Sequence, residues 1–231
     1  MLYTEEAVRA GLRVRDGRRV FYLPEGSRLT PAARDWLRQE GVTVVPHAET
    51  PPAAYRTPDG AAFAEKPEHM THLRGNILVP KTHPRIAFRG GIDTLEAELL
   101  LCAQAADGPL RQTLCAMLDF VRSLIRADVL DEPVQAVRFL GLDDDGLREH
   151  SHHPEREEGQ PHFLPAPDDP PILLRLNRLR TAVRQTELLA CHAFSLPDGT
   201  LARPDLVKAL NRLSSLCWIL MIREKKNAQG K

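Results

Sequence analysis

Residues 176–187 read LNRLRTAVRQTE, and residues 206–220 read LVKALNRLSSLCWIL. In both stretches apolar residues recur every three or four positions, which is the period of a helix that buries one face. Residues with polar groups border the two apolar stripes, namely Arg180, Arg184 and Glu187 on the first helix and Asn211, Ser214, Ser215 and Trp218 on the second. A polar group beside a buried stripe costs ~1 to 3 kcal/mol if it has no partner. The two stretches therefore predict a helical bundle that carries a ligand site.

The helical period continues towards the N-terminus from this pair. Long amphipathic helices are expected at residues 84–107, 110–130, 172–194 and 204–223, with short helices at 134–140 and 143–151 and a loop at 154–171. Four long amphipathic helices bury their apolar faces against one another. The predicted fold is thus mainly α, a four- or five-helix bundle that occupies residues 71–225.

The N-terminal part has a different pattern. Residues 18–23 and 42–45 have the composition of strands, and Thr30 followed by Pro31 is a typical start for the helix expected at 32–39. These elements predict a small α+β module over residues 1–46. Residues 47–70 are rich in proline and have no period, which is typical of a linker.

Composition excludes several classes of function. Lys plus Arg and Asp plus Glu both number 31 in 231 residues, so no overall basic field exists to attract nucleic acid or an acidic membrane. The four cysteines form no Cys-x-x-Cys pair and fall in helical apolar patterns, which favours reduced core thiols. No apolar run reaches the roughly 18 residues of a membrane span, and no signal pattern opens the chain. We expect a soluble, cytoplasmic protein.

Basic residues gather at the start of the first long helix. Arg85, Arg89 and Asp93 follow one another at intervals of four, with Lys81 just upstream. Guanidinium groups match phosphate oxygens in two-point geometry, and an ammonium group adds a compact charge. Lys81, Arg85 and Arg89 are therefore candidates for a phosphate site. The alternative is a solvated helix face with an Arg89–Asp93 pair.

Gly90-Gly91 lies inside the same predicted helix. Each glycine lowers the stability of a helix by ~1 kcal/mol relative to alanine. A glycine pair inside a helix therefore indicates that another backbone or a ligand approaches closely there. Asp93 also has a possible partner across the bundle, in Arg180 or Arg184. Such a pair is either part of a site or an ordinary interhelical salt bridge.

Metal and nucleophile motifs are weak. Glu149 and His152 have the Glu-x-x-His spacing of di-iron bundles, but such sites need a second pair and Pro154 interrupts the helix. The cluster of His150, His152, His153 and His162 is then expected to hold no metal and to have no other role. No serine lies in a Gly-x-Ser-x-Gly elbow, so a hydrolase triad is not predicted.

The motifs together resemble one family. The run at residues 176–187 with Arg203-Pro-Asp and Asn211-Arg-Leu-Ser-Ser215 is similar to the ethanolamine-utilization cobalamin adenosyltransferases. Further similarities lie in order along the chain: Leu29-Thr-Pro-Ala-Ala-Arg34, Thr71-His-Leu73, Lys81, Pro84-Arg85, Phe88-Arg89, Asp93, Arg126-Ala-Asp128 and Asp131-Glu-Pro133. A more distant likeness, to the propanediol-utilization type, is confined to the bundle motifs.

The resemblance implies a transferase that moves the 5′-deoxyadenosyl group of ATP to the cobalt of reduced cobalamin, which is a substrate. Cobalt(I) is itself a strong nucleophile, so such an enzyme must align C5′ of ATP, neutralise the phosphates and exclude water. The same likeness implies that Asp93 and Arg180 form a catalytic pair, and that Arg184, Glu187 and Asn211 bind the nucleotide with Lys81, Arg85 and Arg89. Phe163 is similar to an aromatic wedge that removes the lower ligand of cobalt.

The same resemblance sets expectations for cofactors and partners. Mg²⁺ is expected to accompany ATP, whereas a transition metal is doubtful because residues 46–70 contain no cysteine. A reductase, an ethanolamine ammonia-lyase system and a homo-oligomer are the expected partners, and association with a bacterial microcompartment is left open. The alternative function is a non-catalytic corrinoid carrier or chaperone on the same bundle. The third hypothesis is that the chain is a helical scaffold protein.

Overall fold

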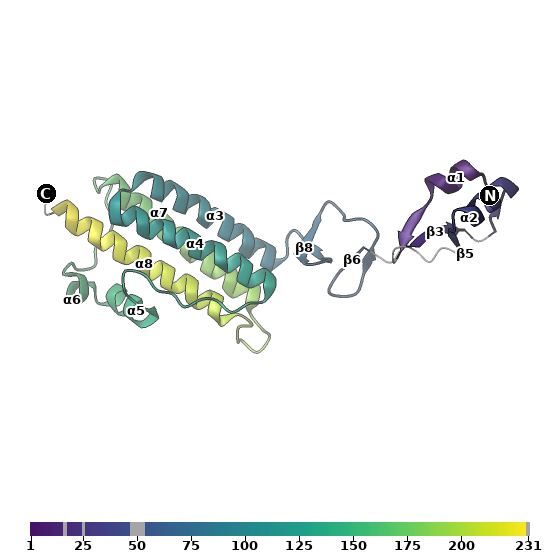
Figure 1. The fold of residues 1–231 in the computed structure, drawn as a ribbon. Coiled ribbons are helices and arrows are strands. Elements are labelled where there is room, and N and C mark those ends of the chain that lie inside the picture. Colours follow the sequence, from purple (N-terminus) through teal and green to yellow (C-terminus); the bar gives the residue numbers. More distant parts are fainter. Residues whose placement is uncertain (16–17, 25, 47–53, 230–231) are drawn as a thin grey trace. The chain divides into compact units, whose positions relative to one another are not determined.

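The computed structural model describes residues 1–15, 18–24, 26–46 and 54–229 (Figure 1). The chain divides into two compact units. One contains residues 1–68 with 76–78, and the other contains residues 69–75 with 79–231.

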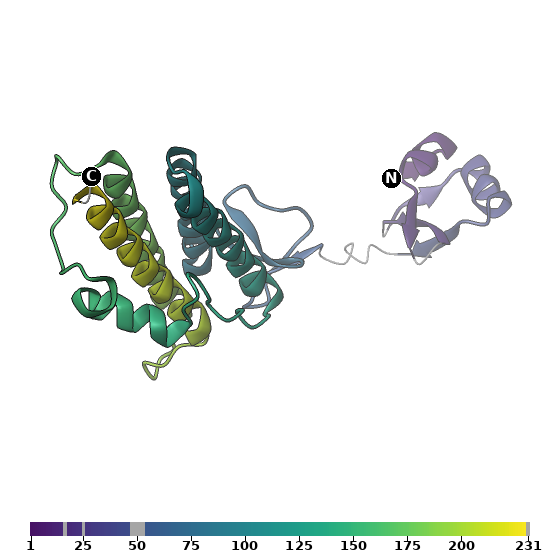
Figure 2. The same ribbon diagram turned by 60° about the vertical axis from the view of Figure 1, so that its left-hand side comes forward.

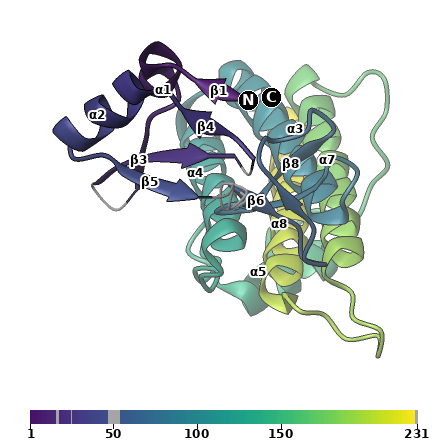
Figure 3. The same ribbon diagram turned by 90° about the vertical axis from the view of Figure 1, so that its right-hand side faces the viewer.

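The first unit begins with a small α+β module. Strand β3 (Arg18–Leu23) pairs in parallel with β5 (Thr43–Pro46), which lies beside it in Figure 3. On its other side β3 pairs antiparallel with β2 (Arg13–Arg15). Helices α1 (Glu5–Ala10) and α2 (Pro31–Gln39) complete it, and β1 (Leu2–Tyr3) pairs in parallel with β4 (Arg28–Leu29). The core of the module consists of Val8, Phe21, Ala33, Leu37 and Val42. The α+β module is thus confirmed.

The predicted start of α2 is confirmed in detail. Thr30 is extended, and its hydroxyl oxygen accepts a hydrogen bond from the backbone N–H of Ala33 at 3.2 Å. Pro31 occupies the first turn, where its missing N–H costs nothing. A local signal of this kind depends only on neighbouring residues, which is why the sequence reveals it.

Short strands follow in the region expected to be a linker. Strand β6 (Tyr55–Arg56) pairs antiparallel with β7 (Ala62–Phe63) and parallel with β9 (Ile77–Pro80). Strand β8 (Met70–Arg74) belongs to the second unit. Residues 47–53 lie outside the described residues, and the domain boundaries at 46 and 70 stay predictions.

The second unit is a helical bundle, as predicted. Its long helices, which run side by side in Figure 2, are α3 (Pro84–Ala105), α4 (Gly108–Leu130), α7 (Pro171–Phe194) and α8 (Pro204–Gln229). Helix α3 packs against α4 and α7, and α7 packs against α8. Their facing leucines, such as Leu95, Leu176 and Leu210, are fully buried. Burial of these stripes, rather than helix propensity, holds the bundle together.

The predicted helix at 134–140 is wrong. The segment is extended and ends in a bridge between Phe139 and Leu142. Val137 and Phe139 are buried while Arg138 between them is exposed, which is a period of two. The backbone N–H of Val134 donates to the carboxylate of Asp205 at 3.1 Å, which ties the start of the segment to α8.

Two short helices connect the bundle helices. Helix α5 (Asp144–His152) matches the prediction, and Asp143 caps it by accepting from the Gly146 N–H at 3.0 Å. Helix α6 (Pro154–Glu158) lies in the segment that was expected to be a loop. Pro154 therefore ends one helix and begins the next, because proline is tolerated in a first turn.

Gly91 allows α3 and α7 to approach closely. The Thr186 hydroxyl donates to the Gly91 carbonyl oxygen at 3.1 Å. A Cβ at residue 91 would lie 2.8 Å from Leu189 Cδ1 and 3.3 Å from Thr186 Oγ1, whereas a Cβ at Gly90 would meet nothing within 4 Å. The close approach predicted for the glycine pair thus belongs to Gly91.

All four cysteines are free thiols. Cys102 and Cys217 are buried, Cys191 is half-buried and Cys115 is exposed, so the prediction of core thiols is wrong for Cys115. Burial raises the pKa of the Cys102 thiol to about 11, and burial also raises the pKa values of Cys191 and Cys217. Among the helices that the structure describes, none has the length and apolar character required for a membrane span.

Candidate functional site

A pocket of about 470 Å³ opens between helices α5, α7 and α8 and the segment that precedes α7. One side of it is polar. Arg180 and Arg184 come from α7, and Asn211, Ser214 and Ser215 come from α8. These are the polar positions beside the apolar stripes, so the helical period places them together.

The amide of Asn211 is held at both ends. Its Nδ2 donates to Glu187 Oε1 at 3.0 Å, and its Oδ1 accepts from Arg212 Nη1 at 2.7 Å. Arg212 is only 7% exposed. Because neighbouring side chains fix its two ends, the Asn211 amide presents a defined edge to the pocket.

Arg180 has an unsatisfied group. Its guanidinium carbon lies 5.4 Å from the centre of the Trp218 ring, a cation–π contact. Its Nε is buried and has no hydrogen-bond partner among the described residues. A buried donor without a partner costs ~1 to 3 kcal/mol, so the site favours a ligand that brings an acceptor.

The other side of the pocket is aromatic and apolar. Phe163, Leu164 and Pro165 line it from the segment before α7, opposite Trp218 on α8. The Phe163 and Trp218 rings stack at 5.1 Å with an angle of 21° between their planes. The side chain of Leu164 is 91% exposed. A flat apolar molecule can therefore contact this side.

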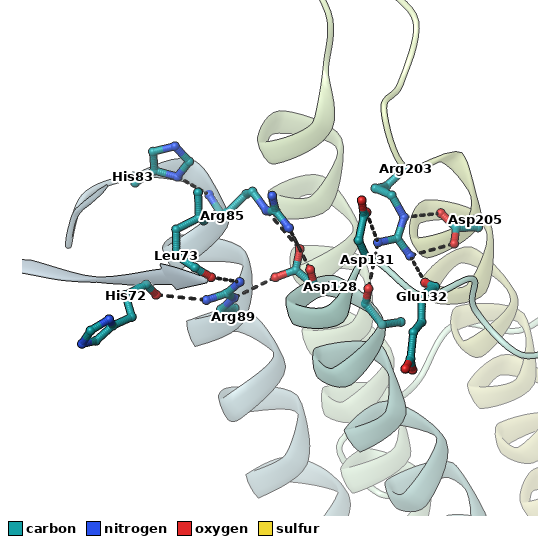
Figure 4. Close-up of polar contacts among 11 residues, drawn as sticks. His72, Leu73, His83, Arg85, Arg89, Asp128, Asp131, Glu132, Arg203 and Asp205 are labelled. Atoms are coloured by element: carbon teal, nitrogen blue, oxygen red, sulfur yellow. Dashed lines mark hydrogen bonds and ion pairs between the residues drawn. The ribbon is translucent and has the colours of Figure 1, made fainter. Parts of the chain in front are cut away.

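A second polar cluster lies where α3, α4 and β8 meet (Figure 4). Arg85 Nε donates to Asp128 Oδ1 at 3.0 Å, and Arg89 Nε donates to Asp128 Oδ2 at 2.7 Å. Arg89 also donates to the backbone oxygens of His72 at 3.3 Å and Leu73 at 2.8 Å. The Asp128 side chain is fully buried. The cluster thus ties β8 to the ends of two long helices.

His83 begins α3 beside this cluster. Its Nδ1 accepts from the backbone N–H of Arg85 at 3.1 Å, as an N-cap does. Burial lowers the pKa of His83, and the charges of Arg85 and Arg89 lower it further. Both effects keep the imidazole neutral, so that it can act as the acceptor.

Arg203 joins the end of α4 to the start of α8 (Figure 4). It donates to the backbone oxygens of Ala127 at 3.0 Å and Glu132 at 2.9 Å, and it pairs with Asp205 at 2.8 Å. The hydrogen bonds from Arg203 hold the pKa of Asp205 below its ordinary value. The Arg203-Pro-Asp motif of the sequence is thus a helix junction.

The structure brings most of the predicted site residues together. Phe163, Arg180, Arg184 and Asn211 line the pocket, and Glu187 binds Asn211. Asp93 is exposed on α3, and within the described residues no ion pair joins it to Arg180 or Arg184. The predicted pair is therefore not formed inside one chain.

The two arginines predicted to bind phosphate both contact Asp128, and their role at a phosphate stays a prediction. Within the described residues no ion pair joins Arg89 to Asp93. Lys81 is exposed just before α3. The spacing of four places the two arginines on one helix face, and their carboxylate partner inside the chain comes from another helix.

Sequence reasoning gave no role to Trp218, Asp128 or Arg212. Trp218 was visible as a member of the polar stripe, and Asp128 as part of the Arg126-Ala-Asp128 motif. No three His, Cys, Asp or Glu side chains within the described ranges converge as metal ligands. His150 instead contacts Glu158 at 2.9 Å, and Arg223 also contacts Glu158, at 2.8 Å. Burial opposes ionisation of Glu158, but the bonds from Arg223 and His150 outweigh it and lower its pKa.

The bundle and its pocket define a known class of fold. It is similar to a variant PduO-type ATP:corrinoid adenosyltransferase from Lactobacillus reuteri complexed with cobalamin and ATP, with a TM-score of 0.55 and 17% identity over 70% of this chain and 91% of that one. A second variant, complexed with ATP, gives a TM-score of 0.55 with 15% identity over 70% and 92% of the two chains. These likenesses establish the helical-bundle fold.

Residues 62–224 match the cobalamin adenosyltransferase family, and the chain belongs to this family. It is 30% identical over 242 residues to the corrinoid adenosyltransferase EutT of Salmonella typhimurium, covering 95% of this chain and 90% of that protein. It is 31% identical over 243 residues to EutT of Escherichia coli, with the same coverage. The resemblance predicted from the sequence is confirmed, and the chain is a transferase of this class.

Proposed function

We propose that the chain transfers the 5′-deoxyadenosyl group of ATP to the cobalt of reduced cobalamin. The cobalt(I) electron pair forms a bond to C5′ of ATP, and the C5′–O bond breaks, so that its electrons leave with the phosphate chain. The product is adenosylcobalamin. The two-sided pocket between α7 and α8 is the observation that carries this proposal.

The polar side suits the nucleotide. Arg180 and Arg184 supply guanidinium groups, and the Nε of Arg180 needs an acceptor that the described part of the chain does not provide. Asn211 is fixed by Glu187 and Arg212, so it binds without losing much side-chain freedom. These groups orient the adenosine and neutralise charge on the departing phosphates.

The apolar side suits the corrinoid. Phe163, Leu164 and Trp218 form a wall that excludes water from the metal face of the substrate. No general base is needed, because the nucleophile is the reduced metal of the substrate. Phe163 occupies the position at which we expect the lower axial ligand of cobalt to be displaced.

A second copy of the chain completes the site in this proposal. A volume of about 470 Å³ is in the range for one ligand, whereas ATP and a corrinoid together need more room. Asp93 is exposed without an ion pair in the described residues, and Arg180 retains an unbonded Nε. We expect Asp93 of one copy to reach Arg180 of another. Lys81 stays the proposed phosphate contact, with Mg²⁺ arriving bound to ATP.

The cellular setting follows from the relatives. Since the curated relatives named above are EutT adenosyltransferases, we infer that the product serves ethanolamine ammonia-lyase and that a reductase supplies cobalt(I). The proposed site of action is the cytoplasm, with or without a microcompartment.

The test is anaerobic mixing of cob(I)alamin with MgATP. The expected result is an ATP-dependent, light-sensitive adenosylcobalamin spectrum. The alternative, a corrinoid carrier, would bind cobalamin without consuming ATP. A scaffold would show no thermal shift with ATP. Either of these results would overturn the proposed reaction.

Phe163→Ala should separate reduction from transfer. We expect conversion of cob(II)alamin with a reductant to fall by about tenfold to a hundredfold, or ~1.4 to 2.7 kcal/mol of activation free energy. Binding of ATP and conversion of chemically prepared cob(I)alamin should stay near the wild-type values, because that substrate has already lost its lower ligand. Phe163→Leu, which keeps apolar bulk, is the matched control. Equal loss of ATP binding and of conversion would refute the wedge role.

A further inference from the structure

Trp218 is the residue at which three residues of the pocket meet. Its ring stacks on Phe163 at 5.1 Å, lies nearly parallel to the His162 ring at 5.7 Å, and has the Arg180 guanidinium 5.4 Å from its centre. Phe163 and His162 come from the segment before α7, and Arg180 comes from α7 itself. Trp218 therefore links the apolar and the polar sides of the site.

The hydrogen bond between Trp218 and His162 has a defined direction. Trp218 Nε1 lies 3.2 Å from His162 Nδ1, and an indole N–H can only donate. His162 Nδ1 must therefore be the acceptor, which places the imidazole proton on Nε2. That nitrogen lies 3.4 Å from the backbone oxygen of His152, to which it donates. Both contacts thus require the same neutral tautomer.

Few other bonds hold the segment that carries Phe163. Residues 160–165 lie between α6 and α7 without helix or strand. Apart from the two bonds of His162, the described hydrogen bonds of this stretch are limited to a 3.4 Å bond from the Gln160 N–H to the Pro154 oxygen. Phe163 itself stacks on Trp218, packs against the bundle core and has Lys225 Nζ 5.6 Å from its ring centre. His162 therefore fixes the backbone next to Phe163.

Building on the proposed function, we propose that Trp218 and His162 are positioning residues for Phe163, in the step that removes the lower ligand of cobalt before transfer. The indole N–H holds His162, and His162 holds the backbone next to Phe163 at the angle that the corrinoid requires. Stacking alone does not explain the pair, because a phenylalanine at 218 would stack equally well on Phe163. The added feature of tryptophan is the N–H, and it is used on the residue next to the proposed wedge.

Three variants test the bond. Trp218→Phe keeps an aromatic ring and removes the donor, His162→Phe keeps a ring and removes the acceptor, and the double variant removes both. Each single variant should convert cob(II)alamin with a reductant about fivefold to tenfold more slowly, which is the usual size of one hydrogen bond. The slowing with cob(I)alamin should be smaller than the slowing with cob(II)alamin, because cob(I)alamin has already lost its lower ligand. The double variant should be no slower than either single variant, because the two residues act through one bond.

A matched control and a second readout keep the test independent of folding and of the proposed reaction. Trp36→Phe changes the other unit of the chain, where the indole contacts Arg9, and should leave all rates unchanged. In the ligand-free protein, amide exchange over residues 160–165 should quicken in Trp218→Phe and His162→Phe but not in Trp36→Phe. The positioning role would be overturned if the rate losses of the two single variants multiply in the double variant. It would also be overturned if amide exchange over residues 160–165 is unchanged. Absence of any ATP-dependent product with the wild type would instead overturn the proposed function, and the exchange experiment would still decide the role of the bond.

Discussion

Asp128→Ala should lower the free energy of unfolding by about 3 kcal/mol, because it leaves two guanidinium groups beside a buried site without their anion. The Asp128 side chain is fully buried, and the side chains of Arg85 and Arg89 are 22% and 17% exposed. The arginines retain some contact with water, which places the loss at the low end for a buried ion pair. Urea denaturation followed by circular dichroism measures it.

Asp119→Ala is the matched control on the same helix. Its side chain is 81% exposed and lies 3.9 Å from Arg122, so the free energy of unfolding should change by less than about 0.5 kcal/mol. The combination of Asp128→Leu with Arg85→Met and Arg89→Met should recover most of the stability, since it removes the orphaned charges together with their partner. A stable Asp128→Ala protein would show that the cluster contributes little to the fold.

The two adjacent glycines of α3 should respond to alanine in opposite directions. Gly91→Ala should destabilise the protein by about 1 to 3 kcal/mol, because the new methyl group meets Leu189 and Thr186 in the packed crossing of α3 and α7. Gly90→Ala should stabilise it by up to about 1 kcal/mol, because the site is exposed and alanine has the higher helix propensity.

Thermal and urea unfolding of the two variants measure this difference, and each variant serves as the control for the other. If both variants lose the same amount of stability, the cost of an alanine at residue 91 comes from the backbone of α3 and not from contact with α7. If Gly90→Ala is stable but loses activity, a second chain or a substrate approaches α3 at that point.

Local chemistry made much of the fold predictable. Thr30 and Pro31 mark the start of α2 through contacts within one turn, and the long helices follow from apolar stripes that each extend over more than four turns. The segment at 134–140 was mispredicted because contacts with distant parts of the chain hold it, such as burial of Val137 and Phe139 in the bundle core and the bond from the Val134 N–H to Asp205, 71 residues away. A partner at that distance leaves no trace in the local pattern.

The sequence predicted those residues of the site that lie on a single face of a long helix. Arg180 and Arg184 are one turn apart, and Asn211 lies on the helix that packs against theirs, so periodicity and family resemblance together brought them to one pocket. Arg85 and Arg89 had the same regular spacing, but Asp128 engages them from 43 and 39 residues away. Charge spacing on a helix predicts which groups share a face, and it does not predict which partner they meet.

The distribution of the thiols has a practical consequence for optical measurements. Cys102 and Cys217 are shielded inside the bundle, and the raised pKa values keep Cys102, Cys191 and Cys217 protonated at neutral pH. Cys115 is exposed on α4, which does not line the pocket. A maleimide dye should therefore couple first to Cys115, which gives the unmutated protein a preferred attachment point for fluorescence measurements.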